Sequence, residues 1–288
     1  MIDTAIKIED HDWPQWFAAL NYVHEFGGIE CDAGLFEQAE FLSQLKAGGI
    51  HCTHARNLIP DDVPGILDTA QRNHAVPQLY ERLYAAMDTA CSVGDVQSFS
   101  MPFRLDRIPK EEEDAELRRL ATFVSRLLFA PVNHAFNLLV PVRLPRPFPS
   151  SEEISRAVRL CATARETPAD SNINGDWVPS DKRSAFKNGI PSICLHIYPD
   201  EGILPDFNSL DLHLLQPFLG MLCFHYNVNA GETLFDDEQE QWATRLKEHG
   251  FPGTVVFCPD QCPPEAIDSV VTAARTWSNF YLPDPTQE

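Results

Sequence analysis

Residues 219–227, LGMLCFHYN, form a short apolar run that carries one histidine, His225, close to its end. Pro217 lies just before the run and Gly231 lies just after it, so both ends are bounded by residues that interrupt regular structure. A run of this length with such boundaries is typical of a strand that is buried on both faces of a parallel sheet. The stretch therefore predicts an α/β protein with polar residues where its buried strands end.

The same pattern recurs along the whole chain. The predicted strands are residues 4–8, 29–32, 50–56, 96–103, 136–144, 192–198, 219–227 and 254–258. Helical patterns alternate with them, most clearly from Leu117 to Leu128, where apolar residues recur at three- and four-residue spacing. Eight such units predict a closed (β/α)8 TIM barrel. An open doubly wound sheet is the alternative, but the sequence contains neither of its phosphate-binding patterns, GxGxxG and GxxxxGK[ST].

The chain has 288 residues, which fits one barrel, since about 250 residues are typical of this fold. Residues 167–189 are polar and rich in Asn, Asp, Ser and Pro, and the alternation of strands and helices resumes unchanged behind them. We interpret this segment as an insertion within a single domain of residues 1–288. Whether it is a lid, a dimer contact or a surface loop stays open, as does the oligomeric state, a homodimer included.

The chain is strongly acidic. Lys and Arg number 22 against 42 Asp and Glu, which gives a net charge of −20. This balance disfavours nucleic acid and anionic membranes as partners, because both require a basic surface. The first residues lack the basic and apolar regions of a secretory signal, and no apolar stretch approaches the roughly 18–20 residues that span a bilayer.

The chain contains eight cysteines, and Cys52, Cys194, Cys223 and Cys258 are among those in predicted strands. No CxxC pair is present, and Cys258 and Cys262 form only a loose pair. A reduced cysteine in a strand packs as a small apolar residue. We therefore expect buried free thiols and a cytoplasmic protein, and we favour this interpretation over disulfides or a zinc knuckle.

Barrel enzymes form their active sites from residues at the carboxyl ends of the strands. The polar residues predicted there are Glu30, Asp32, His51, His54, Arg56, Arg104, Arg143, His196, Tyr198, Asp200, Glu201, His225, Tyr226, Asn227, Glu232, Cys258 and Asp260. Three arginines in so acidic a chain indicate an anionic or polyhydroxylated small substrate, because the guanidinium group binds carboxylates and phosphates. The alternative is that each arginine pairs with a nearby acid, such as Asp32, Asp106 or Asp200.

Three of the histidines, His54, His196 and His225, share the alternation of positions that face the barrel interior. Because they lie on different strands at the same end, they predict a shared polar site. The alternative is that each is a hydrogen-bonded core residue. A bound metal is a further possibility, and the residue types alone do not require one.

Four local patterns are FGGIECDAG (residues 26–34), LHIYPDEG (195–202), LGMLCFHYN (219–227) and GTVVFCPDQ (253–261). In this order, and over nearly the whole chain, they resemble the xylose isomerase-like TIM barrels of the sugar phosphate isomerase/epimerase superfamily. The resemblance implies proton transfer next to the carbonyl group of a sugar. It also implies a divalent cation, held by Glu, Asp, His and Glu at the ends of strands five to eight.

The chain departs from that ligand pattern. Val142 or Arg143 ends strand five and His196 ends strand six, whereas His225 on strand seven is kept. Strand eight offers Cys258 and, two residues later, Asp260. An arginine repels a cation, so the usual centre is altered. The remaining set of His196, His225 and Asp260, with Glu30 nearby, would favour a transition metal such as Zn over Mg; Zn, Mn and no metal at all stay open.

The sequence thus favours a sugar isomerase or epimerase. Glu30 or His225 would act as the base, and Arg143 would stabilise the enediolate oxygen in place of the metal. The residues predicted to bind substrate are His54, Arg56, Arg104, Tyr198 and Asn227. A noncatalytic barrel that binds a carbohydrate, an anion or a protein is the first alternative, and hydrolase or lyase chemistry is the second, because fold does not fix function.

Overall fold

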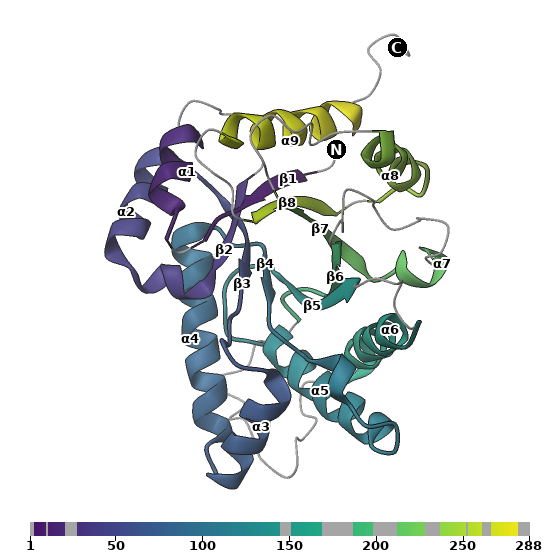
Figure 1. Ribbon diagram of the computed structural model, residues 1–288. Helices are drawn as coiled ribbons and strands as arrows, with labels where there is room; N and C mark the ends of the chain where they lie inside the picture. The colour runs from purple at the N-terminus through teal and green to yellow at the C-terminus, as the bar shows by residue number, and fades with distance from the viewer. Residues whose placement is uncertain are drawn as a thin grey trace.

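Eight parallel strands close into a barrel in the computed structural model of the chain (Figure 1). The strands are β1 (Asp3–Lys7), β2 (Gly28–Asp32), β3 (Cys52–Arg56), β4 (Ser98–Ser100), β5 (Asn137–Leu144), β6 (Pro191–Ile197), β7 (Leu219–Asn227) and β8 (Thr254–Asp260). Each strand pairs with the next along the chain, and β8 pairs with β1. The predicted (β/α)8 TIM barrel is confirmed, and the open sheet is excluded.

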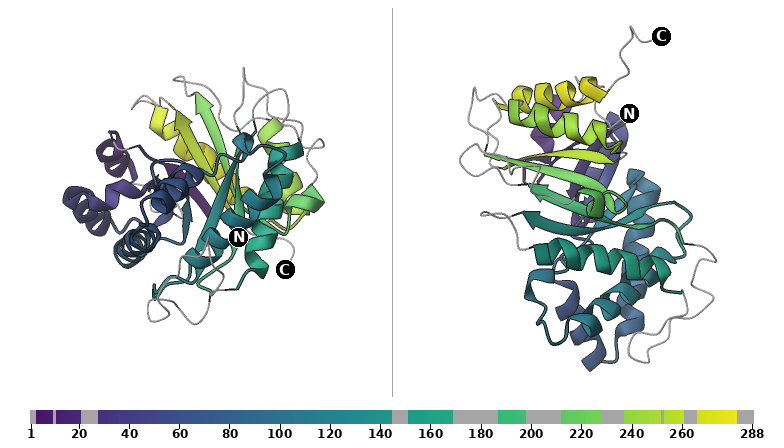
Figure 2. Two further views of the ribbon diagram at one scale, coloured as in Figure 1. Left: turned by 90° about the horizontal axis from the view of Figure 1, so that it is seen from below. Right: turned by 90° about the vertical axis from the view of Figure 1, so that its right-hand side faces the viewer.

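Helices surround the barrel on its outside (Figures 1 and 2). They are α1 (Trp13–Leu20), α2 (Ala39–Gly48), α3 (Val63–Arg72), α4 (Val76–Gly94), α5 (Glu113–Leu128), α6 (Ser151–Glu166), α7 (Leu212–Leu215), α8 (Asp237–Glu248) and α9 (Ile267–Tyr281), with short 3-10 helices η1 (Ala33–Glu37) and η2 (Leu105–Arg107). The structure describes residues 3–9, 11–20, 28–144, 151–168, 187–197, 212–227, 237–251, 253–260 and 266–281. Among these helices, none has the length and apolar character needed to cross a bilayer.

The main core lies between the barrel and the helices. Phe224 on β7 packs against Trp242 of α8 and Trp277 of α9, with ring centroids 5.9 and 5.1 Å apart. Phe257 on β8 contacts Trp277 from the neighbouring strand. Burial of each large side chain contributes roughly 1.5–3 kcal/mol to folding. The outward-facing residues of the apolar strands thus attach the helices to the barrel.

A second, smaller cluster fills the inside of the barrel. Its members are Ala5, Leu139, Cys194, Met221, Cys223, Val256 and Cys258. Successive side chains of a strand point to opposite faces, so in β7 Leu222 and Phe224 face the helices while Cys223 and His225 face inward. The interior is apolar at this level, and charged and polar side chains follow it toward the carboxyl ends of the strands.

One predicted strand is much shorter in the structure, and a short helix precedes α2. The strand predicted at residues 96–103 is shortened to β4, because Pro102 has no N–H group for a ladder and Arg104 has a positive φ of 47°. The segment after β2 begins with η1 before α2. Asp32 accepts a hydrogen bond from Gly34 N at 2.9 Å, which caps this tighter turn.

The end of the predicted insertion packs beside α5 and α6. Lys187 Nζ donates to the carbonyl oxygen of Ala164 at 2.8 Å, and Asn188 Nδ2 donates to that of Ala130 at 2.6 Å. Residues 169–186 lie outside the described part, so the role of the insertion stays a prediction. The seven cysteines that the structure describes are free and buried, which confirms the expected reduced thiols for these positions; Cys262 lies outside the described residues.

Candidate active site

Two histidines meet at the carboxyl ends of β6 and β7. His196 Nδ1 lies 2.9 Å from His225 Nε2, and the two rings are tilted by 35° with centroids 5.2 Å apart. His225 is buried, with 6% of its surface exposed, whereas His196 is partly exposed. One imidazole donates to the other, so the pair holds a proton between two basic nitrogens. The predicted convergence of these two histidines is present in the structure.

Glu30 on β2 lies inside the barrel below these histidines. It is 1% exposed, and its Oε2 accepts a hydrogen bond from the Cys223 thiol at 3.7 Å. Burial alone would raise the pKa of the Glu30 carboxyl, but His54, Arg56 and His196 lower it below its usual value. The carboxyl is therefore ionised. It places a negative charge within reach of the imidazole pair.

Arg56 at the end of β3 faces the same interior. Its Nη2 donates to Glu9 Oε2 at 2.7 Å and to the carbonyl oxygen of Ile8 at 3.0 Å. Its Nη1 lies 3.5 Å from Glu30 Oε1. This nitrogen is buried and makes no hydrogen bond with any described residue. Arg56 thus pairs with acids, as the alternative interpretation expects, and still has a donor for a bound molecule.

His54, predicted to bind substrate, is held by two serines of β4. Ser98 Oγ donates to the carbonyl oxygen of Thr53 at 3.0 Å, so it accepts the hydrogen bond from His54 Nδ1 at 2.9 Å. His54 Nε2 then accepts from Ser100 Oγ, also at 2.9 Å. Burial lowers the pKa of His54, although the charge of Glu30 acts in the opposite direction. His54 is therefore a neutral residue of the interior whose two ring nitrogens are both bonded.

Arg104 lies away from this group. Its side chain is 40% exposed and pairs with Asp106 at 3.3 Å, which is one of the acids that the pairing interpretation names. The left-handed backbone at Arg104 directs the chain out of β4 into η2. Among the described residues, no hydrogen bond or ion pair joins Arg104 to the histidines. Its role in substrate binding stays a prediction.

Four other predicted site residues are described only in part. In the sheet, Arg143 is the neighbour of His196, and Asn227 is the neighbour of Asp260. The backbones of these residues therefore end on the same rim as the histidine pair. Their side chains, and the whole of Tyr198, lie outside the described residues.

Lys7 also belongs to this site, and it was not among the residues predicted from the sequence. It is the last residue of β1, its Nζ lies 2.6 Å from Glu9 Oε1, and its side chain is only 15% exposed. Burial would lower the pKa of Lys7, but Cys258 and Glu9 raise it above its ordinary value, so the residue stays charged. The alternation of side chains could have indicated Lys7: it lies two residues after Ala5 on β1, and Ala5 faces the interior.

Comparison with solved structures identifies the fold. A 3-keto-D-glucoside 4-epimerase from E. coli superposes with a TM-score of 0.56 at 15% identity, over 96% of this chain and 100% of the other. A D-allulose 3-epimerase from Methylomonas sp., in complex with D-allulose, gives 0.57 at 10% identity, over 98% and 97%. A family 2 AP endonuclease from Brucella melitensis gives 0.54 at 13% identity, over 92% and 96%.

The chain has the TIM-barrel fold of these proteins. The sequence itself matches no family model and no curated protein. At these identities the likeness concerns the fold alone.

The resemblance of the sequence to xylose isomerase-like barrels implies a cation at the carboxyl ends of β5 to β8, and the residues present do not fit a hard ion such as Mg²⁺. At these positions the chain has Arg143, His196, His225 and Cys258, with Asp260 at the end of β8. Hard cations prefer an oxygen-rich ligand set, and a guanidinium group in the set repels them. Groups of thiol, imidazole and carboxylate ligands do converge inside the barrel. The proposed chemistry therefore uses no cation at the rim.

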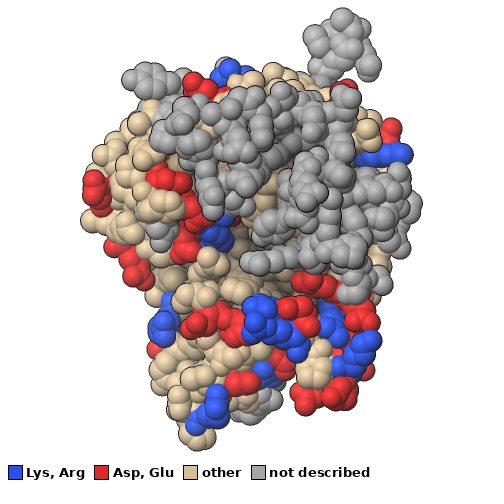
Figure 3. All heavy atoms as spheres, viewed as in Figure 1, with Lys and Arg blue, Asp and Glu red and all other residues tan. Residues whose placement is uncertain are grey.

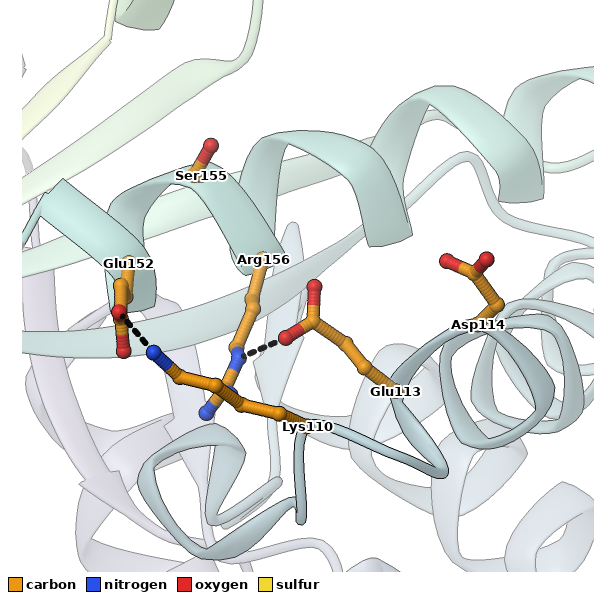
Figure 4. A pocket seen from close by; sticks show the side chains of 6 residues that line it. All are labelled: Lys110, Glu113, Asp114, Glu152, Ser155 and Arg156. Atoms are coloured by element: carbon orange, nitrogen blue, oxygen red, sulfur yellow. Dashed lines mark hydrogen bonds and ion pairs between the residues drawn. The ribbon is translucent and has the colours of Figure 1, made fainter.

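A surface cavity of about 380 Å³ opens beside this barrel, between the start of α5 and the start of α6 (Figure 4). Its charged groups pair with one another: Lys110 Nζ lies 2.8 Å from Glu152 Oε1, and Arg156 Nε lies 2.9 Å from Glu113 Oε2. Blue and red groups accordingly lie side by side over this part of the surface in Figure 3. The cavity is a network of ion pairs, and we assign the chemistry to the interior of the barrel.

Proposed function

We propose that the protein is an isomerase or epimerase that moves a proton at the carbon next to the carbonyl group of a small sugar or hydroxy acid. The hydrogen-bonded pair of His196 and His225 carries this proposal. It lies at the carboxyl ends of β6 and β7, where barrel enzymes have their active sites. An imidazole titrates close to neutral pH, so it can both accept and return a proton.

In this mechanism His225 takes the proton from carbon, and His196 shares the resulting positive charge through their hydrogen bond. The ionised carboxylate of Glu30 stabilises that charge from below. Glu30 itself is a weak base, because its pKa is lowered. Of the two bases that the sequence predicts, we therefore propose His225 for the proton transfer and Glu30 for charge stabilisation.

Two arginines would bind the oxygen atoms of the substrate. Arg56 Nη1 is buried without a hydrogen-bond partner among the described residues, so it can donate to a hydroxyl or carboxylate oxygen. Arg143 neighbours His196 in the sheet, and we propose that its charge stabilises the enediolate oxygen. Tyr198, Asn227 and Arg104 stay proposed substrate-binding residues.

The structural neighbours support a sugar substrate more than a nucleic acid. Two of the three neighbours described above are sugar epimerases, and the third is an AP endonuclease. Binding to DNA requires many phosphate contacts from Lys and Arg, whereas this chain has a net charge of −20. The charge balance thus favours the small-molecule substrate.

The test is the exchange of carbon-bound hydrogen with solvent. The protein is incubated in deuterated water with ketoses, aldoses and hydroxy acids, and deuterium at the carbon next to the carbonyl is measured by mass spectrometry. We expect exchange with at least one compound, and its loss in His225→Gln. His249→Gln is the matched control, because His249 follows α8 at the opposite end of the barrel and bonds the carbonyl oxygen of Arg245.

A noncatalytic binding barrel is the second candidate, favoured by one observation: Glu30 and Arg56 already pair with each other inside the barrel. In that case the compounds would raise the melting temperature of the protein without any deuterium incorporation. Absence of exchange across the whole panel would overturn the proposed isomerase or epimerase.

A further inference from the structure

Three cysteines lie inside the barrel next to the histidine pair, and we call them the thiol layer. Cys194, Cys223 and Cys258 lie on β6, β7 and β8, each two residues before His196, His225 and Asp260 respectively. All three thiols are at most 1% exposed. The cation of a xylose isomerase-like barrel would lie at the rim, whereas Cys194 and Cys223 each lie two residues before the rim histidine of the same strand.

The spacing within the layer is close to that of metal ligands, and the two sulfur atoms would move apart by about 0.4 Å on binding an ion. Cys194 Sγ lies 3.4 Å from Cys223 Sγ and 3.5 Å from His196 Nε2. In a tetrahedral zinc site, Zn–S bonds of about 2.3 Å and Zn–N bonds of about 2.0 Å separate two sulfur atoms by about 3.8 Å and a sulfur from a nitrogen by about 3.5 Å. The ligand atoms of Cys194, His196 and Cys223 all lie within 4.8 Å of one another.

We propose that Cys194, His196 and Cys223 bind a thiophilic divalent ion, for which Zn²⁺ is the probe of choice. Two thiolates and one neutral imidazole around a divalent ion give a site without net charge, which suits a buried position. Binding releases two thiol protons and leaves the fourth position of the ion open. Soft sulfur ligands select Zn²⁺ or Cd²⁺ over Mg²⁺ and Mn²⁺.

A second group, Glu30, Cys223 and Cys258, also converges, but it is the weaker candidate. All three of its members are buried, whereas His196 is partly exposed and gives an ion a route from the rim. Cys223 belongs to both groups, and Glu30 is already engaged with Arg56 at 3.5 Å. The group that contains His196 is therefore the one we assign.

The contact between the two histidines prepares His196 for this role. His196 uses Nδ1 for its hydrogen bond with His225, which leaves Nε2 pointing at Cys194. A metal-bound histidine commonly bonds a partner through its other ring nitrogen, and this contact fixes the orientation of the ring. The metal site does not depend on the proposed function, because the protein can bind the ion with or without catalysis.

A second pair of close, buried thiols serves as a control for the alternative that Cys194 and Cys223 only fill space in the interior. Cys31 Sγ and Cys52 Sγ also lie 3.4 Å apart and are buried. Among the described residues, this pair belongs to neither group of three converging ligands. If a close pair of buried thiols were enough to bind the ion, both pairs would do so.

The experiment titrates the reduced, metal-free full-length protein with Co²⁺ and follows the near-ultraviolet charge-transfer band from thiolate to cobalt. We expect saturation at one equivalent, and displacement by Zn²⁺ but not by Mg²⁺. Cys194→Ser and Cys223→Ser should lose the band, while Cys52→Ser should keep it in full. His196→Gln, which leaves both thiols in place, should weaken binding of Co²⁺ by about tenfold or more.

Native mass spectrometry of the unmodified protein gives a second readout that needs no variant to fold. We expect one zinc adduct whose mass is that of the ion minus two protons. No adduct and no charge-transfer band would overturn the site, and so would a band that persists in Cys194→Ser or disappears in Cys52→Ser. If the unmodified protein showed the cobalt band but no deuterium exchange with any compound, the result would count against the proposed function alone.

Discussion

His196 Nδ1 and His225 Nε2 are separated by 2.9 Å, and each residue lies two positions after an inward-facing cysteine of its own strand. Two imidazole rings joined by one hydrogen bond take up and release a proton together. We expect His196→Gln and His225→Gln each to lower the rate of deuterium exchange by about 10²–10⁴-fold. The double variant should be no slower than the worse single variant, because the pair shares one function. Additive losses in this double-mutant cycle would contradict a shared proton.

The buried pair of Glu30 and Arg56 is expected to govern stability. Glu30→Gln removes the negative charge and leaves the guanidinium of Arg56 inside the barrel with less compensation. We expect a loss of about 3 kcal/mol in the free energy of unfolding, measured by urea denaturation. The control is Glu152→Gln in the exposed pair with Lys110, which should leave the midpoint unchanged. If Glu30→Gln and Glu152→Gln had equal urea midpoints, the buried ion pair would contribute no more to stability than the exposed pair.

The fold could be predicted from the sequence to a large extent, and β7 shows why. Each residue from Leu219 to Asn227 belongs to one apolar run between breaking residues, so the predicted and observed bounds coincide. The end of β4 could not be predicted from the sequence in the same way. Its sequence stays apolar up to Phe103, and only the missing N–H group of Pro102 and the left-handed Arg104 end the pairing.

The candidate site could be predicted in position but not in its contacts. The position of Glu30, His196 and His225 at strand ends, and the alternation of side chains along each strand, predicted that these residues lie together. Both features follow from the geometry of a parallel barrel. The partner of Arg56 was missed, because Glu9 lies beyond the end of β1 and no periodicity points to it. The cysteines of the interior were interpreted as apolar filling, since alternation gives the direction of a thiol and not its distance from a histidine.

Stability should fall in mild acid because of His54. The pKa of buried His54 is below its usual value of 6.5, so the unfolded chain binds a proton that the folded chain resists. This contribution is complete above about pH 6.5 and is lost as the pH falls toward the folded pKa, by at most about 1.4 kcal/mol per pH unit. The lowered pKa of Glu30 acts in the same direction, but only below its usual value of 4.5.

The measurement compares wild-type protein with His54→Gln at a series of pH values. The wild type should be more stable at about pH 8, and its advantage in free energy of unfolding should shrink toward about pH 5. The glutamine cannot take up a proton, so the variant lacks this part of the pH dependence. An advantage that stays constant over this range would mean that His54 is protonated equally in both states.

Alanine substitutions at Gly28 and Gly49 distinguish the cost of a steric clash from the cost of backbone strain alone. Gly28 begins β2 with a φ of 157°, and a Cβ atom there would lie 2.7 Å from the carbonyl oxygen of His51 and 2.7 Å from Cγ2 of Thr53. That carbonyl accepts the hydrogen bond of Ile29 N at 2.9 Å, so it cannot move away without breaking the contact between β2 and β3. Gly49 has a φ of 60° and no atom within 4 Å of the added carbon.

We therefore expect Gly49→Ala to cost about 1 kcal/mol, which is the strain of a left-handed residue. Gly28→Ala should cost about 3 kcal/mol, because strain adds to a clash with fixed backbone. Urea denaturation of both variants measures the difference. If the two losses were equal, the carbonyl of His51 would be free to shift, and the start of β2 would not be fixed by its pairing with β3.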